Sequence, residues 1–206
     1  MLTKDQIKGY RQQALDNFDK AGIVLTEIEK QGIEIADFGL GEYEQTGLAV
    51  LVYVNTERCC AKELAMLPRQ TCPEHRHPNV GSSLGKEETF RCRWGKMYLY
   101  ISGPAAAAPR PSPDPHQGSE PRGVAGEASG CRSARAMPPA GRAATYTAWH
   151  EIELNPGDQY TLQPNTLHWF QSGPEGAVVS EFSTHSTDEN DVFTDPEIAR
   201  ITQVIG

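Results

Sequence analysis

Cys72–Gly95, with the sequence CPEHRHPNVGSSLGKEETFRCRWG, carries the strongest structural signal in this chain. His75 and His77 are two residues apart, so on an extended strand both imidazoles project from the same face. After a glycine-containing turn region, Glu88 begins an alternating run that continues through Phe90, Cys92 and Trp94. A carboxylate beside such an apolar face is costly to bury unless it is paired or ligates a cation. The segment therefore predicts strands that bring metal-ligating groups together.

A second unit, Pro156–Phe170 (PGDQYTLQPNTLHWF), supplies a third imidazole. Gly157 and Pro164 bracket a strand-turn-strand pattern that leads to His168, with Phe170 on the same strand face. Three imidazole nitrogens and one carboxylate oxygen suit a mid-row divalent ion such as Mn, Fe, Co, Ni or Zn, and they leave coordination positions open for substrate oxygens. We therefore expect one metal to be held by His75, His77, Glu88 and His168.

Short apolar or alternating runs predict strands over residues 47–54, 61–67, 89–94, 96–102, 148–154 and 177–184. Turn signals separate these runs, and no helix-length pattern alternates with them. An antiparallel sandwich or barrel is therefore favoured over a parallel sheet. The N-terminus differs, because Thr3 and Gln6 form a capping-box pattern ahead of apolar residues at helical spacing, which predicts a helix over 3–21.

Residues 104–144 break this pattern, since 24 of these 41 residues are Pro, Gly or Ala. Such a composition supports neither a sheet nor a packed helix. We interpret the segment as a disordered or loosely packed insert that joins two strands of a single domain spanning residues 1–206. A functional lid and a locally shifted reading frame are the alternatives.

The composition excludes several classes of protein. A net charge of −8 argues against nucleic-acid binding, which needs clustered Lys and Arg. No run approaches the length of a membrane span, and the first residues do not resemble a signal peptide, so we expect a cytoplasmic protein without a membrane partner. Five cysteines without a CxxC pair fit reduced thiols. A small molecule is the expected partner.

The two histidine-containing units together resemble the two motifs of the cupin family. The first has the HxH pair and then Glu88, which is followed after six residues by Gly95; the second runs from Gly157 through Pro164 to His168. The gap of ten residues between the HxH pair and Glu88 is longer than is usual in the family. The resemblance implies an all-β cupin fold, a double-stranded β-helix or jelly-roll barrel.

A closer resemblance emerges when the flanking segments are included. Residues 61–67 (AKELAML), 75–77 (HRH), 86–88 (KEE), 164–170 (PNTLHWF) and 178–198 (VVSEFSTHSTDENDVFTDPEI) look like those of the D-lyxose isomerases, a family of cupin-type sugar isomerases. The resemblance implies an aldose–ketose isomerase that converts D-lyxose to D-xylulose, with D-mannose and D-fructose as a second pair. It also implies Mn²⁺ as the metal and a homodimer as the assembly.

Isomerisation moves hydrogen between adjacent carbons, so a base must take and return a proton while a divalent ion stabilises the enediolate. Glu181 is the candidate base, because a carboxylate among apolar neighbours tends toward raised basicity. Lys86 could donate to a sugar oxygen or hold an acidic partner, and Lys62 has the same options. By resemblance, Asp188 and Asp191 would accept hydrogen bonds from distal hydroxyls. A solvent-exposed surface residue is the alternative for each.

Two other functions are compatible with the same four ligands. A cupin dioxygenase would use three histidines and one glutamate to activate oxygen at iron. A cupin that binds sugar or metal without turnover is the non-enzymatic alternative. Oxygen uptake would identify the dioxygenase, whereas Glu181 and Lys86 both pointing away from the metal would favour the binding protein.

Overall fold

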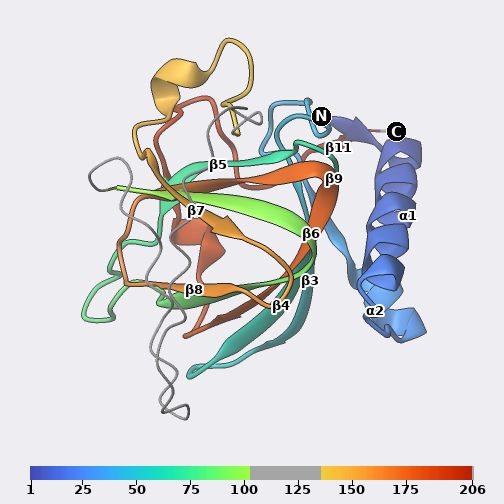
Figure 1. The fold of residues 1–206 in the computed structure, drawn as a ribbon, viewed down its shortest axis with the longest axis horizontal. Helices are drawn as coiled ribbons and strands as arrows, with labels where there is room; N and C mark the ends of the chain where they lie inside the picture. Colours follow the sequence, from blue (N-terminus) through green and yellow to red (C-terminus); the bar gives the residue numbers. More distant parts are fainter. Residues whose placement is uncertain (103–135, 206) are drawn as a thin grey trace, which may run out of the picture.

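The computed structural model describes residues 1–102 and 136–205, so residues 104–135 of the predicted insert (104–144) lie outside the described residues. Within them, a nine-stranded antiparallel sheet curls into a barrel, and helices α1 and α2 lie along one outer side of it (Figure 1). This arrangement confirms the predicted all-β cupin barrel with an N-terminal helix. No helix in the described ranges is both long enough and apolar enough to cross a membrane.

The elements of these two ranges are, in chain order, β1 (Leu2–Thr3), α1 (Lys4–Lys20), α2 (Glu27–Gly32), β2 (Glu34–Ala36), β3 (Leu48–Asn55), β4 (Cys60–Met66), β5 (Thr71–Arg76), β6 (Glu88–Ile101), the 3-10 helix η1 (Ala143–Thr145), β7 (His150–Leu154), β8 (Gln159–Leu162), β9 (His168–Ser183), the 3-10 helix η2 (Asp188–Asn190), β10 (Val192–Phe193) and β11 (Val204–Ile205). The strand order is β10-β5-β9-β4-β3-β2, and β6 pairs with β7, β8 and β9. Because β9 pairs with β4, β5 and β6, it connects the strands that carry the site.

Strand β6 departs from the prediction at Trp94. The two predicted strands 89–94 and 96–102 form one strand, whose register with β9 shifts between Cys92 and Trp94 and again after Gly95. Gly95 has a φ of +70°, and a Cβ there would lie 2.2 Å from the carbonyl oxygen of Gly176. The shift places Trp94 in the outer apolar layer, while Phe90 and Cys92 belong to the barrel interior. The expectation that Trp94 shares their face is therefore wrong.

Apolar side chains form two main layers. One fills the barrel and includes Leu64, Phe90, Leu99, Ile152, Phe170 and Val179. The other lies between the sheet and α1, where Phe18 is fully buried. Helix α1 begins at the predicted capping box, in which Thr3 Oγ1 accepts from Gln6 N and Gln6 Oε1 accepts from Thr3 N. The apolar spacing gives no signal for α2, because none of its six residues is buried.

Residues 136–144, the last part of the predicted insert, lie against the barrel. The backbone N–H of Met137 donates to Gln171 Oε1 at 3.2 Å, and Gln171 Nε2 donates to Met137 O at 2.7 Å. Arg142 forms ion pairs with Asp195 at 2.8 Å and with Glu197 at 3.0 Å. These contacts attach the segment to β9 and to the residues after β10, so this part of the insert is packed rather than loose.

Candidate metal centre and active site

Three buried histidines meet inside the barrel. His75 lies near the end of β5, His77 follows that strand, and His168 is the first residue of β9. His75 and His168 face each other across the β5–β9 ladder. The candidate ligand atoms of all three lie within 4.8 Å of one another, close enough for a single cation to bind them. The structure thus brings together the three imidazoles that the two sequence units provide.

Each imidazole is oriented by an acceptor at its Nδ1 atom. His75 Nδ1 donates to Pro73 O at 2.8 Å, and His168 Nδ1 donates to Thr166 O at 2.9 Å. His77 Nδ1 lies 2.5 Å from the carboxylate oxygen Oδ1 of Asp191. A carbonyl oxygen can only accept, so Nδ1 carries the proton in His75 and His168 and their Nε2 lone pairs are left to ligate. This is the tautomer that a metal site needs.

Glu88, the first residue of β6, lies against two of these rings. Its Oε1 is 3.1 Å from His77 Nε2 and 3.1 Å from His168 Nε2. His168 Nε2 is buried and has no hydrogen-bond partner among the described residues. A carboxylate oxygen facing a lone pair at this distance is repulsive unless a proton or a cation lies between them. The donor set therefore fits a divalent cation.

The pKa shifts of the residues in this centre also fit a bound cation. Burial, together with His168 and His77, lowers the pKa of His75 well below its usual value, so this ring is a neutral ligand. Burial would also lower the pKa of His77, but Glu88 and Asp191 outweigh it and raise that pKa to about 9. Despite its burial, Glu88 has a pKa well below the usual range because Lys86 and the histidines stabilise its charge. A cation would replace the proton that His77 otherwise holds.

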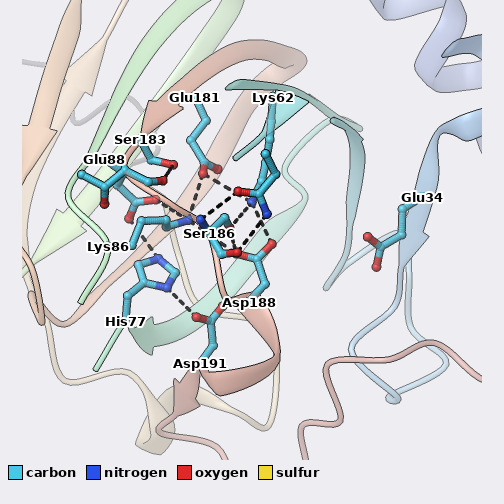
Figure 2. Close-up of polar contacts among 12 residues, drawn as sticks. Glu34, Lys62, His77, Lys86, Glu88, Glu181, Ser183, Ser186, Asp188 and Asp191 are labelled. Carbon is cyan, nitrogen blue, oxygen red and sulfur yellow. Dashed lines mark hydrogen bonds and ion pairs between the residues drawn. The ribbon is translucent and has the colours of Figure 1, made fainter. Parts of the chain in front are cut away.

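A chain of buried charges extends from Glu88 (Figure 2). Lys86 Nζ lies 2.8 Å from Glu88 Oε2 and 2.9 Å from Glu181 Oε1. Lys62 Nζ lies 2.7 Å from Asp188 Oδ2 and 3.5 Å from Glu181 Oε1. Burial opposes the charge on both lysines, but the surrounding carboxylates raise their pKa values above the usual one. Burial of both lysines and of Glu181 excludes the surface alternative for these three.

The surroundings of Glu181 differ from the expectation. The sequence predicts apolar neighbours, whereas the carboxylate lies beside the ammonium groups of Lys86 and Lys62. The antiparallel ladder between β4 and β9 explains the difference, because it pairs Lys62 directly with Glu181. The expectation of apolar neighbours around Glu181 is therefore wrong. Glu181 pairs instead with Lys86, which also pairs with Glu88.

The two aspartates play different structural parts. Asp188 belongs to the charge chain, and burial opposes its charge, but Lys86 and Lys62 lower its pKa well below the usual value. Asp191 instead lies against the ring of His77, away from the lysines in Figure 2. Both aspartates line the same pocket, but Asp188 pairs with Lys62, whereas Asp191 contacts a metal-ligand candidate.

Apart from His168, the residues of the site line one pocket together with apolar residues, which include Phe38, Leu48, Val50, Leu64, Phe90, Phe170 and Phe193. Arg200 also lines the pocket, pairs with Glu34 at 2.5 Å and lies 3.6 Å from Asp188. Ser186 lies 2.8 Å from Lys62 Nζ. Neither Arg200 nor Ser186 belongs to a local pattern in the sequence, so only the tertiary fold reveals them.

Comparisons of the sequence identify similar proteins. A family model described as D-lyxose isomerase matches residues 128–205. A protein named D-lyxose/D-mannose isomerase from Thermosediminibacter oceani is 53% identical over 204 residues, which cover 99% of each chain. A D-lyxose ketol-isomerase from a Thermofilum species is 52% identical over the whole of both chains.

Comparisons of the structure show the same barrel in solved proteins. The L-ribose isomerase of Acinetobacter sp. DL28, crystallised as a mutant with L-ribose, superposes with a TM-score of 0.73 at 17% identity, over 99% of this chain and 98% of that one. The L-ribose isomerase of Cellulomonas parahominis gives a TM-score of 0.69 at 18% identity, over 95% and 94% of the two chains. These matches show the shared fold. With sequence identities above one half along its full length, this chain belongs to the D-lyxose isomerase family of sugar isomerases.

Proposed function

We propose that this protein is a metal-dependent aldose–ketose isomerase that converts D-lyxose to D-xylulose, and also D-mannose to D-fructose. One observation carries the proposal: His75, His77 and Glu88 line one pocket with the Lys86–Glu181 pair, and His168 lies within reach of the same ion. The names of the two relatives, D-lyxose/D-mannose isomerase and D-lyxose ketol-isomerase, support this choice of substrates. We further propose that it acts as a homodimer in the cytoplasm, as the family resemblance implies.

The metal, which we propose to be Mn²⁺, would be held by His75, His77, His168 and Glu88. When bound, it would supply Lewis-acid stabilisation of the negative charge that develops on two neighbouring sugar oxygens. His168 Nε2 has no hydrogen-bond partner among the described residues and lies 3.1 Å from Glu88 Oε1, and this observation supports the ligand set. Lys86 would hold the second oxygen of Glu88 and so fix the orientation of that carboxylate.

Glu181 would transfer the proton. The reaction needs one base that removes a proton from one carbon and returns it to the adjacent carbon. Among the described residues, Lys86 and Lys62 both contact Oε1 of Glu181, which leaves Oε2 for the proton. The ammonium of Lys86 lies between Glu181 and Glu88, where it could donate a hydrogen bond to a sugar oxygen. Asp188 and Lys62 would bind a hydroxyl at the far end of the sugar.

Asp191 would act on the metal through His77 rather than on the sugar. Replacing Asp191 with alanine removes the acceptor that orients the His77 ring, so we expect Mn²⁺ affinity to fall by about tenfold or more. A competition titration against a fluorescent chelator measures this affinity. Glu189→Ala, which removes an exposed carboxylate nearby in η2, is the control and should leave the affinity unchanged. Equal affinities for wild type and Asp191→Ala would contradict the role of Asp191.

The proposed function is tested by incubating the Mn²⁺-loaded protein with D-lyxose in D₂O. We expect D-xylulose to form, deuterium to enter the sugar to the extent that the base exchanges its proton with solvent, and chelation by EDTA to stop turnover. Oxygen uptake should be absent, because proton transfer by Glu181 consumes none. Failure to form a ketose from D-lyxose or D-mannose, with a full complement of metal, would overturn the proposal.

A further inference from the structure

Glu74 is a buried carboxylate that lies next to the metal-ligand candidate His75 in β5. Its Oε2 accepts from the backbone N–H groups of Thr147 and Ala148, both at 2.7 Å. Its Oε1 accepts from Thr147 Oγ1 at 2.9 Å and from Thr194 Oγ1 at 2.8 Å. All four donors are neutral, and they come from two segments that are distant in sequence. A buried acceptor with this many donors holds its partners in a defined arrangement.

One of these segments contains β10, the two-residue strand at the edge of the sheet. Strand β10 pairs with β5 so that Phe193 faces His75, and the two rings have centroids 5.4 Å apart. Asp191, which contacts His77, immediately precedes the strand. A ladder of two residues gives β10 little attachment of its own. The contacts of Glu74 with Thr194 add a side-chain hydrogen bond and a backbone hydrogen bond of 3.1 Å directly after it.

We propose that Glu74 is a positioning residue of the metal centre. Through Thr194, it fixes β10 and so the placement of Asp191 against His77 and of Phe193 against His75. Its bonds to Thr147 and Ala148 serve a separate purpose, since they hold the segment that leads into β7. The inference rests on the proposed metal site, but its readouts do not depend on sugar turnover.

Two variants, each of which removes one side-chain hydrogen bond of Glu74, separate these two roles. Thr194→Val removes the hydroxyl that joins Glu74 to the β10 segment, and Thr147→Val removes only the side-chain bond to the other segment. Both changes keep the shape of the side chain. We expect Thr194→Val to weaken Mn²⁺ binding by about tenfold, as the loss of support for a ligand does in other metal sites. We expect Thr147→Val to lower the melting temperature without changing the affinity.

A second readout uses the metal-free protein. Side-chain ¹⁵N NMR follows the Nδ1 atom of His77, whose shift reports its bond to Asp191. Thr194→Val should move or broaden this signal, and Thr147→Val should leave it in place. Glu74→Gln should have the same effect as Thr194→Val, but a larger one. The glutamine amide has a single acceptor oxygen, so its NH₂ group must face donors that the second carboxylate oxygen now accepts from. If it does not fold, the two threonine variants decide the question.

The proposal is overturned if Thr194→Val leaves both the Mn²⁺ affinity and the His77 signal unchanged, or if Thr147→Val changes them equally. Either result would make Glu74 a residue of general stability. These outcomes differ from a failure of the proposed function, in which the wild-type protein would bind Mn²⁺ and show the His77–Asp191 bond but would not convert D-lyxose.

Discussion

Replacing His168 with alanine is expected to remove stable metal binding and to lower kcat/KM for D-lyxose by roughly 1000-fold, because the cation's contribution of several kcal/mol to transition-state stabilisation is lost. His168 supplies an Nε2 lone pair that has no other partner among the described residues, and it faces His75 across the β5–β9 ladder. Without this ligand, His75, His77 and Glu88 would have to hold the ion alone. Metal content after dialysis and steady-state kinetics measure the two effects.

His185→Ala is the matched control for this variant. His185 is exposed, and its ring contacts only the carbonyl oxygen of Thr56 among the bonds that the structure describes. Its replacement should change neither metal content nor kcat/KM. Far-UV circular dichroism should show the same barrel for both variants, since the backbone of β9 is unchanged. A His168→Ala protein that keeps one tightly bound Mn²⁺ and wild-type activity would refute the ligand assignment.

Replacing Glu181 with glutamine is expected to lower kcat by about 100- to 10,000-fold, the range that a general base contributes, while metal binding persists. The amide keeps the size of the carboxylate and a carbonyl oxygen for Lys86, but it cannot take a proton from carbon. Deuterium exchange into the sugar should fall by the same factor as kcat. KM for D-lyxose should change much less, because the other contacts to the sugar remain.

Glu175→Gln provides a control on the same strand, six residues before Glu181, where the side chain is exposed. It should leave kcat, KM and metal content at wild-type values. If Glu181→Gln retains full deuterium exchange, Glu181 is not the base. If it instead loses the metal, the carboxylate supports the lysine–glutamate chain of Lys86 and Glu88 rather than transferring the proton. Either result contradicts the role proposed for Glu181.

Much of the metal centre could be predicted because its signals are local. The HxH pair and the turn before His168 each occupy a few consecutive residues, and their periodicity in a strand fixes which side chains share a face. Glu88 could be predicted as a ligand because a carboxylate at the start of an apolar alternating run is costly to bury unless it is paired or binds a cation. The structure brings His75, His77 and His168 within reach of a single ion.

The remaining contacts depend on pairing between distant strands. The sequence does not reveal that Lys62 lies opposite Glu181, because that contact is set by the register of β4 on β9. The register shift that moves Trp94 to the outer layer also depends on tertiary context, although Gly95 marks its position in the sequence. The contact of Asp191 with His77 requires β10 to pair with β5, and a two-residue strand has no periodicity to detect.

We expect one divalent cation to be bound by side chains from three distant segments of the barrel. A crystal structure of the Mn²⁺-loaded protein, with diffraction recorded on both sides of the manganese absorption edge, tests it most directly. We predict one strong anomalous peak inside the barrel, bonded to the Nε2 atoms of His75, His77 and His168 and to the carboxylate of Glu88, with Asp191 still bound to His77 Nδ1. A peak elsewhere in the protein, or none at these four side chains at full metal occupancy, would contradict the account.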